Sequence, residues 1–362
     1  MRAPGTGDAR SLRRSAARAG VDRAARARIG GRGWGWTIAA TLTGVIGGWL
    51  GAQATRAAPT RAAATVEREA RGRYHFIRPL LRVDVAGKED FPELRPLERR
   101  FESLIHDAIG AGRARHVSVY FRDLDAERWV GVDEDRRYIA ASLMKVPLAV
   151  AWLQQSEVQP DLLARQIPFL PDTIHDAEQS ITSGAPLVRG RSYSADDLLR
   201  KMLVDSDNDA FQLLIDNAGA GVEETWRDLG IVPRTDPNTP TTVSPREYAA
   251  TFRALYSATV VERSSSERTL ELTAASTFHD GLVAGVPAGT VVSHKFGERT
   301  LVDAQGTRRE LHDCGIVYHP RGPYVMCVMT EGDDFRTLAS TIADLSKLAF
   351  TEAGAIELSS AN

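Results

Sequence analysis

The stretch Ser142-Leu-Met-Lys145 decides how the rest of the chain is interpreted, because two further motifs follow it in a fixed order. These are Ser206-Asp207-Asn208 and His294-Lys295-Phe296-Gly297. Ser142 is the only serine with a lysine three residues after it. A Ser-x-x-Lys sequence occurs easily by chance, whereas the same sequence followed by Ser-Asp-Asn and Lys-x-Gly does not. The three motifs are therefore interpreted together as one catalytic site.

Ser142 and Lys145 are the candidate nucleophile and base. A serine hydroxyl is a poor nucleophile until a base takes its proton. The apolar run 142–154 predicts a buried helix with Ser142 in its first turn, and positions i and i+3 lie on one face of a helix. Burial and a second cation, Lys295, would lower the pKa of Lys145 and make it a base. The alternative role for Ser142 is that of a helix N-cap.

The second motif supplies a hydroxyl and an amide. We expect Ser206 to relay a proton to the leaving nitrogen and Asn208 to hold a substrate amide, while Asp207 points into the helical lobe and holds the loop. The alternative is that the run 205–209 is only a polar cap for a helix that begins at Ala210.

The third motif lies near the end of the β-branched run 290–293. The charge of Lys295 would attract a substrate carboxylate, and Gly297 would let the backbone approach the substrate closely. The backbone N–H groups of Glu298 and Ser142 would form the oxyanion hole. The alternative for Lys295 is an exposed lysine on an edge strand.

Together the motifs resemble the S-x-x-K, S-D-N and K-T-G signature of class A β-lactamases and related penicillin-recognising serine hydrolases, over about residues 91–353. The stretch 228–251, with Asp-Leu-Gly and Thr-Thr-Val-Ser-Pro-Arg-Glu-Tyr, also resembles that family. The resemblance implies an acyl-enzyme mechanism and β-lactam or D-alanyl peptide substrates, with no cofactor. It implies an α/β fold of the β-lactamase/transpeptidase type, in which helices flank an antiparallel sheet beside an all-helical lobe.

The chain departs from the family pattern in two places. Phe296 replaces the hydroxyl residue of K-T-G, which removes a donor to the substrate carboxylate and places a ring where it narrows or reshapes the cleft edge. The loop 231–240 lacks the E-x-x-L-N sequence, so we expect ready acylation and slow release of penicillins. Asp236 is the only acid in that loop and is short for positioning a water, while Glu223 and Glu224 belong to the preceding helix.

Two other functions remain open. A D,D-peptidase or other amide hydrolase would use the same residues. A non-catalytic, membrane-anchored protein that binds a cell-wall or protein ligand is favoured by Phe296 and the short loop. The intact set of Ser142, Lys145, Ser206 and Asn208 argues against this second alternative.

The N-terminal region is strongly asymmetric in charge. The chain has 362 residues, is 43% hydrophobic and carries a net charge of −2, which gives no case for nucleic-acid binding. Residues 1–33 hold nine arginines and two aspartates. An uncharged stretch with tryptophans near both ends follows, which predicts a transmembrane helix over 34–54 with the basic side in the cytoplasm. The alternative is a signal peptide cleaved after Ala54. Either would place the catalytic part outside the cytoplasm.

The remaining organisation follows from periodicity and turns. The predicted regions are a basic cytoplasmic tail (1–33), an anchor (34–54), a linker (55–90), the catalytic domain (91–353) and a C-terminal tail (354–362). Helices are predicted over 91–109, 142–154, 198–204, 209–217, 245–256 and 334–353, and strands over 116–121, 129–132, 290–295, 311–318 and 324–330.

Cys314 and Cys327 are the only cysteines. They flank a turn between two predicted strands, so opposed positions would bring them within disulfide range. The alternative is a pair of small buried thiols. The eight histidines show no spacing typical of metal ligands, and His294 is expected to support its strand.

Overall fold

The computed structural model describes residues 65–68, 74–84 and 91–360, except for 173, 176–178, 182–183, 233–235, 237–238 and 304–305. Within these residues, no helix is both long and apolar enough to cross a bilayer. The predicted basic tail, 1–33, and the predicted anchor, 34–54, lie outside the described residues.

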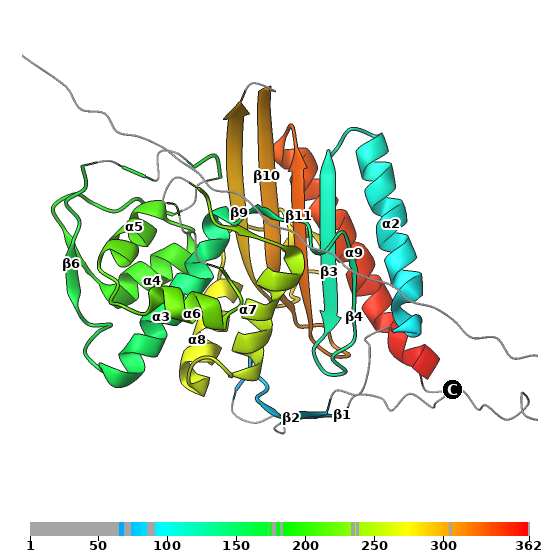
Figure 1. Cartoon of the computed structure of the whole chain (residues 1–362), viewed down its shortest axis with the longest axis horizontal. Coiled ribbons are helices and arrows are strands. Elements are labelled where there is room, and N and C mark those ends of the chain that lie inside the picture. Colours follow the sequence, from blue (N-terminus) through cyan, green and yellow to red (C-terminus); the bar gives the residue numbers. More distant parts are fainter. Residues whose placement is uncertain are drawn as a thin grey trace, which may run out of the picture. The chain divides into compact units, whose positions relative to one another are not determined.

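A five-stranded antiparallel sheet with the strand order β4-β3-β11-β10-β9 forms the centre of the fold (Figure 1). The strands are β3 (His116–Asp123), β4 (Trp129–Val132), β9 (Val292–Asp303), β10 (Gly306–Val317) and β11 (Tyr324–Gly332). The predicted strands are confirmed. β9 begins two residues later than predicted and continues to Asp303, because it pairs with β10 along its whole length. β9 is an edge strand, and it carries the Lys295-x-Gly motif.

Two helices cover one face of this sheet (Figure 1). They are α2 (Arg95–Gly110), which follows the short 3-10 helix η1 (Pro92–Leu94), and α9 (Phe335–Ser360). The predicted stripe of α2 is buried at Leu97, Phe101 and Ile105, and its proline lies in the first turn, where a missing N–H costs nothing. α9 continues through residues that were assigned to the C-terminal tail.

The other face of the sheet contacts a helical lobe. Its helices are α3 (Lys145–Val158), α4 (Ala195–Val204), α5 (Asn208–Asp216), α6 (Val222–Asp228), α7 (Pro245–Ser257) and α8 (Arg263–Ala274), with the 3-10 turn η2 (Ala141–Met144). The 3-10 turn η4 (Leu282–Gly285) instead packs against α9. Four short strands form two small pairs, β5 (Tyr138–Ile139) with β8 (Thr242–Val243) and β6 (Gln166–Pro168) with β7 (Ser192–Ser194). The predicted α/β architecture with an all-helical lobe is confirmed.

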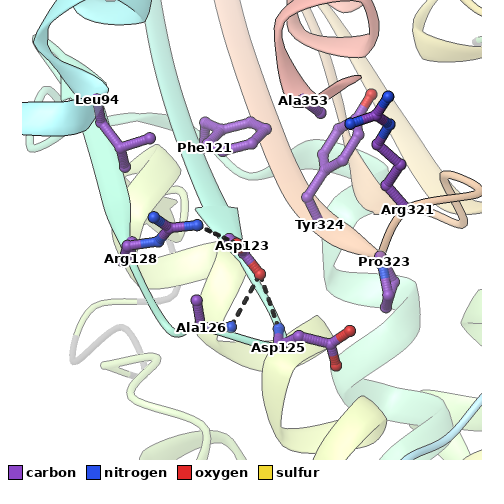
Figure 2. A pocket seen from close by; sticks show the side chains of 11 residues that line it. Leu94, Phe121, Asp123, Asp125, Ala126, Arg128, Arg321, Pro323, Tyr324 and Ala353 are labelled. Atoms are coloured by element: carbon purple, nitrogen blue, oxygen red, sulfur yellow. Dashed lines mark hydrogen bonds and ion pairs between the residues drawn. The ribbon is translucent and has the colours of Figure 1, made fainter. Parts of the chain in front are cut away.

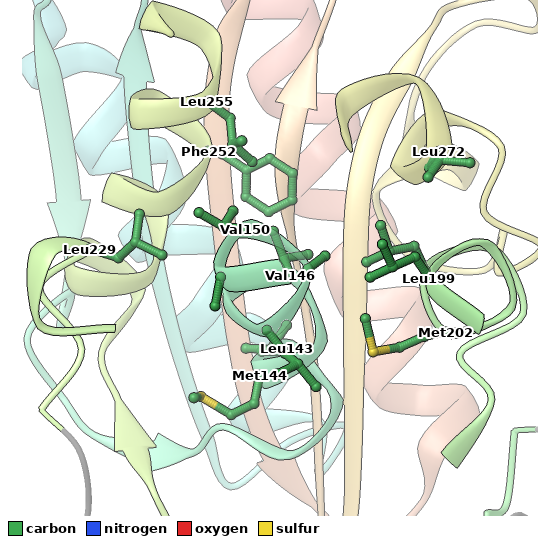
Figure 3. Packing of buried hydrophobic residues seen from close by; sticks show 14 of the residues in the cluster. Leu143, Met144, Val146, Val150, Leu199, Met202, Leu229, Phe252, Leu255 and Leu272 are labelled. Carbon is green, nitrogen blue, oxygen red and sulfur yellow. The ribbon is translucent and has the colours of Figure 1, made fainter. Parts of the chain in front are cut away.

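The helix that follows Ser142 runs through the middle of the lobe. Every residue of α3 from Lys145 to Leu153 is buried, as expected for a helix that is apolar on all sides. Figure 3 shows Val146 and Val150 among side chains from α4 and α7, including Leu199 and Phe252. This packing fixes the first turn of α3, and with it the position of the candidate nucleophile.

Cys314 and Cys327 are directly opposed in the register of β10 and β11, and they form a disulfide. Their Cα atoms are 4.0 Å apart. The predicted disulfide is therefore confirmed, and the alternative of two free thiols is not.

A further two-stranded ribbon precedes α2, in the segment that was predicted to be a linker. It pairs β1 (Thr65–Arg68) with β2 (Leu80–Asp84). The Arg68 guanidinium pairs with the buried carboxylate of Glu127, and Glu267 accepts hydrogen bonds from the N–H groups of residues 75–77. Sequence analysis did not predict these contacts.

Candidate active site

Ser142 lies in the 3-10 turn η2, immediately before α3. The turn begins with Ala141, whose φ of 47° falls in the left-handed region that non-glycine residues rarely adopt. The Tyr248 hydroxyl donates a hydrogen bond of 2.7 Å to the carbonyl of Leu143. Ser142 itself is half-buried, between this strained entry and the buried residues Leu143 and Met144. The turn therefore holds the serine by its backbone.

Lys145 is the first residue of α3 and is buried, with 1% of its surface exposed. Its ammonium donates to Asn208 Oδ1 at 2.7 Å, to Ser206 Oγ at 3.1 Å and to the carbonyl of Ser206. The structure thus joins the first and second motifs by direct hydrogen bonds across 61 residues of sequence. The Lys145 ammonium thus donates to three oxygen acceptors of the second motif.

Ser206 lies between α4 and α5 with a φ of 58°, a second strained non-glycine residue in the site. Its Oγ accepts hydrogen bonds from both lysines, from Lys145 at 3.1 Å and from Lys295 at 2.9 Å. Since both lone pairs are then used, the hydroxyl proton is available to donate. Asp207 caps α5 by accepting from the N–H of Ala210, so its predicted role in holding the loop is confirmed.

Lys295 is fully buried, which excludes the alternative of an exposed edge-strand lysine. Its ammonium donates to Ser206 Oγ and, at 2.8 Å, to the carbonyl of Phe296, and it lies 4.1 Å from the centre of the Phe296 ring. Burial lowers the pKa of Lys295 well below its usual value, and Lys145 lowers it further. The two lysines and the serine between them form one electrostatically coupled unit.

The Phe296 ring does not narrow the cleft edge, and this expectation is corrected. The ring is 3% exposed and stacks on Phe278, with 4.3 Å between ring centres, in the core beneath α2 and α9. A large apolar side chain gains more by burial there than by lining a polar cleft. The loss of a hydroxyl donor at this position stands, because phenylalanine has none.

Gly297 lies against the turn that carries the nucleophile. A Cβ atom at this position would be 3.0 Å from the carbonyl oxygen of Ala140 and 3.2 Å from the backbone nitrogen of Leu143. The glycine thus allows β9 to pass close to η2. Its expected role of letting the backbone approach a substrate stays a prediction. Glu298 follows it directly on β9.

Glu298 is held by a loop of the helical lobe. One oxygen of its carboxylate accepts hydrogen bonds from the N–H groups of Ser180, at 2.8 Å, and Ile181, at 2.7 Å. Gln179 of the same loop donates to the carbonyl of Ser206 at 2.6 Å. Sequence analysis considered only the backbone N–H of Glu298. The loop 179–181 carried no motif that could have indicated these contacts.

His294 supports the strand, as predicted. Its ring is buried, and Nδ1 lies 2.7 Å from a carboxylate oxygen of Asp313, which is fully buried on the neighbouring strand β10. Asp313 also accepts a hydrogen bond from the N–H of Leu282. Among the described residues, no group of three or more His, Cys, Asp or Glu side chains is placed to hold a metal ion.

A cavity of about 910 Å³ opens beside the nucleophile turn. Ala141 and Met144 line it on one side, Trp226 of α6 and Arg299 of β9 on others. Glu223 and Glu224 lie on α6, as predicted, and Glu223 also lines this cavity. Asp236, which is short for positioning a water, is exposed.

A second pocket, of about 280 Å³, lies away from these residues, between the β3–β4 turn and the turn that precedes β11 (Figure 2). The Asp123 carboxylate in it accepts hydrogen bonds from the N–H groups of Asp125 and Ala126 and from the guanidinium of Arg128. The Asp123 carboxylate thus stabilises the β3–β4 turn. None of the predicted site residues lines this pocket.

The chain is similar to known proteins over most of its length. A family model described as the β-lactamase enzyme family matches residues 96–353, more than half of the chain. No curated protein matches.

Three solved structures illustrate the likeness of fold. A PBP-A variant, solved as an acyl-enzyme complex with penicillin G, is 22% identical over 72% of this chain and 97% of its own, with a TM-score of 0.60. A β-lactamase from Chitinophaga pinensis is 19% identical over 70% of this chain and 99% of its own, with a TM-score of 0.60. A class A β-lactamase from Mycobacterium abscessus is 21% identical over 71% of this chain and 99% of its own, with a TM-score of 0.58.

Proposed function

This chain belongs to the β-lactamase enzyme family, and from that membership we propose that it is a serine hydrolase that opens β-lactams or related D-alanyl amides through an acyl-enzyme on Ser142. The observation that carries the proposal is the Ser206 hydroxyl, which accepts hydrogen bonds from two buried lysines, Lys145 and Lys295. Two cations buried at one hydroxyl are costly for folding, and this cost is expected where a proton has to be transferred.

In the proposed reaction, the Ser142 hydroxyl attacks the substrate carbonyl while its proton passes to Lys145 in the neutral form. The carbonyl oxygen gains the negative charge, which the backbone N–H groups of Ser142 and Glu298 stabilise. The C–N bond then breaks, and the leaving nitrogen takes its proton from Ser206, which is replenished by Lys145. The hydrogen bond between Lys145 and Ser206 supports this transfer.

The second half of the reaction has less support from this chain. A water molecule must attack the acyl-enzyme, and the loop 231–240 lacks the acidic sequence that the family uses there. We therefore propose that release of a penicilloyl group is slow. The same observation favours a D,D-peptidase as the second candidate, since such an enzyme is trapped by penicillin rather than clearing it.

We also propose that the catalytic domain lies outside the cytoplasm, anchored by residues 34–54. The basic segment before that stretch supports this orientation. A disulfide between Cys314 and Cys327 agrees with an oxidising compartment.

The test is the intact mass of the purified protein over time after penicillin G is added, with Ser142→Ala in parallel. The expected result is an adduct on the wild type alone. An adduct that decays within seconds indicates a lactam hydrolase, and one that persists for hours indicates a penicillin-trapped peptidase. No adduct on either protein with several lactams would reject the lactam reaction and favour the non-catalytic binding protein.

A further inference from the structure

A small cavity of about 210 Å³ lies between helix α7 and strands β3 and β4 (Figure 1). In the strand order β4-β3-β11-β10-β9 these two strands form one edge of the sheet, opposite to β9 with its Lys295 motif. None of the predicted site residues lines this cavity. It is therefore a feature separate from the candidate active site.

One face of α7 forms a wall of the cavity. Four residues of the helix line it at the spacing i, i+3, i+4 and i+7, which places them on one side of a helix. They are Arg246, Ala249, Ala250 and Arg253. The two alanines leave room between the two arginines. The side chains of Arg246 and Arg253 are 37% and 45% exposed, so a ligand can reach both from solvent.

Strand β3 contributes a third guanidinium and a hydroxyl. Arg122 and Tyr120 line the cavity, and Arg122 Nη1 donates a hydrogen bond of 3.2 Å to the Tyr120 hydroxyl oxygen. The hydroxyl proton therefore remains available to donate. Burial raises the pKa of the Tyr120 phenol, and the three guanidiniums oppose this rise. Of the described residues that line the cavity, none is acidic.

The buried carboxylate nearest to these groups is shared among three guanidiniums. Glu127 pairs through Oε1 with Arg68 and through Oε2 with Arg122, at 2.7 Å. Arg253 Nη1 lies 3.5 Å from the same Oε2, and the Arg253 guanidinium makes no hydrogen bond to the described part of the chain. One carboxylate against three guanidiniums leaves an excess of two positive charges.

Arg246 differs from the other two arginines of the cavity, because it pairs with Glu134 and Asp135. The whole group then holds four arginines against three carboxylates, and a positive excess remains. The Asp135 side chain is 72% exposed, so solvent and salt screen its charge. The unbalanced charge therefore lies on the Glu127 side of the cavity, where Arg253 has donors to offer.

We propose that this cavity binds a phosphate monoester, held by the guanidiniums of Arg122 and Arg253 and by the Tyr120 hydroxyl. A phosphate monoester carries about −1.5 to −2 charges at neutral pH, which matches the excess around Glu127. Its acceptor oxygens suit the planar fork of an arginine, which donates two parallel hydrogen bonds. A carboxylate brings one charge and leaves part of the excess unbalanced. This site goes beyond the proposed hydrolase function and does not depend on it.

The test is calorimetric titration of the purified protein with glycerol 3-phosphate at constant ionic strength, with glycerol as the blank. We expect saturable binding by the wild type and equally by Ser142→Ala, because the cavity is separate from the nucleophile. The melting temperature should also rise with the ligand concentration, since the unfolded chain has no such site.

Two variants distinguish the cavity from a general attraction between charges. Arg253→Gln removes one guanidinium while Glu127 keeps two, and the dissociation constant should rise at least about tenfold. Ala250→Leu keeps every charge and fills the cavity from an exposed position of the helix, and it should weaken binding to a similar extent. Arg200→Gln, an exposed residue of α4, removes the same charge and should bind as the wild type does.

The melting temperatures without ligand report whether the variants fold. Arg253→Gln should be at least as stable as the wild type, because it removes an unbalanced charge. The source of the phosphate follows from a second ligand, dihexanoyl phosphatidic acid, in the same titration. Binding at least about tenfold tighter than that of glycerol 3-phosphate assigns a lipid head group, whereas equal or weaker binding assigns a small soluble ester.

Two results would overturn the site. One is the absence of saturable binding of either ligand by the wild type. The other is a dissociation constant that Arg253→Gln or Ala250→Leu leaves unchanged, because the phosphate would then bind elsewhere on the molecule.

Discussion

Replacing Gly297 by alanine should displace the turn that carries Ser142. The new Cβ atom would lie 3.0 Å from the carbonyl oxygen of Ala140, 3.1 Å from Leu143 Cγ and 3.2 Å from the Leu143 nitrogen. Two of these are backbone atoms on either side of Ser142, so the turn itself has to move. The φ angle of Gly297 is not in the left-handed region, so alanine adds a contact without dihedral strain.

The size of the effect follows from these distances. At separations of this kind the neighbouring atoms have to move by a few tenths of an ångström. A misplacement of about 1 Å costs about 100-fold in rate, so the smaller shift predicts acylation that is about three- to tenfold slower. The free energy of unfolding should fall by only about 1–2 kcal/mol, as is typical of one added methyl group in a packed site.

The assay is the rate of acyl-adduct formation by intact mass, with thermal unfolding measured on the same samples. Gly110→Ala is the matched control, because a Cβ atom there meets nothing within 4 Å. That variant should acylate at the wild-type rate and gain about 0.5–1 kcal/mol in stability, since alanine is favoured over glycine in a helix. Wild-type acylation by Gly297→Ala, in a protein with an unchanged melting temperature, would refute the claim that this contact positions Ser142.

Three other perturbations test the surrounding structure. Replacing Cys314 and Cys327 together by alanine should lower the free energy of unfolding in urea by about 3 kcal/mol, because the disulfide closes a short loop in the unfolded chain. Adding a reductant to the double variant should have no further effect on its stability. Glu267→Ala should cost about 2–3 kcal/mol, since it leaves three backbone N–H groups without their acceptor, and proteolysis should become faster near residues 75–77. For Lys295 the folded pKa lies well below 10.5, so between the folded and the unfolded pKa the unfolded chain binds more protons and stability rises with pH. The advantage of Lys295→Met over the wild type in urea unfolding should therefore shrink as the pH rises from about 7 to about 10. A constant difference would contradict the lowered pKa of Lys295.

Sequence patterns predicted the parts of this molecule that local chemistry determines. The α7 helix begins where predicted because Ser244 and Glu247 form a capping box around Pro245. The order of the three motifs was sufficient to group Lys145 with Ser206, and the two side chains are joined by a hydrogen bond.

Contacts between distant segments could not be predicted in this way. The direction of the Phe296 ring depends on Phe278, which comes from the loop after α8. The carboxylate of Glu298 is held by the N–H of Ser180, 118 residues earlier in the chain. The β1–β2 ribbon depends on an ion pair between Arg68 and Glu127, and an arginine in an alanine-rich segment resembles any solvated arginine until its partner is known.

The two strained backbones at Ala141 and Ser206 have a meaning for the history of this chain. Each residue holds a left-handed conformation at a cost of about 1 kcal/mol or more, and glycine at either position would relieve it. In a lineage whose site no longer functions, substitutions to glycine at these positions would accumulate by random drift. Only continued selection for turnover would oppose it. The residues that homologous chains carry at these two positions would therefore distinguish catalytically active homologues from inactive ones.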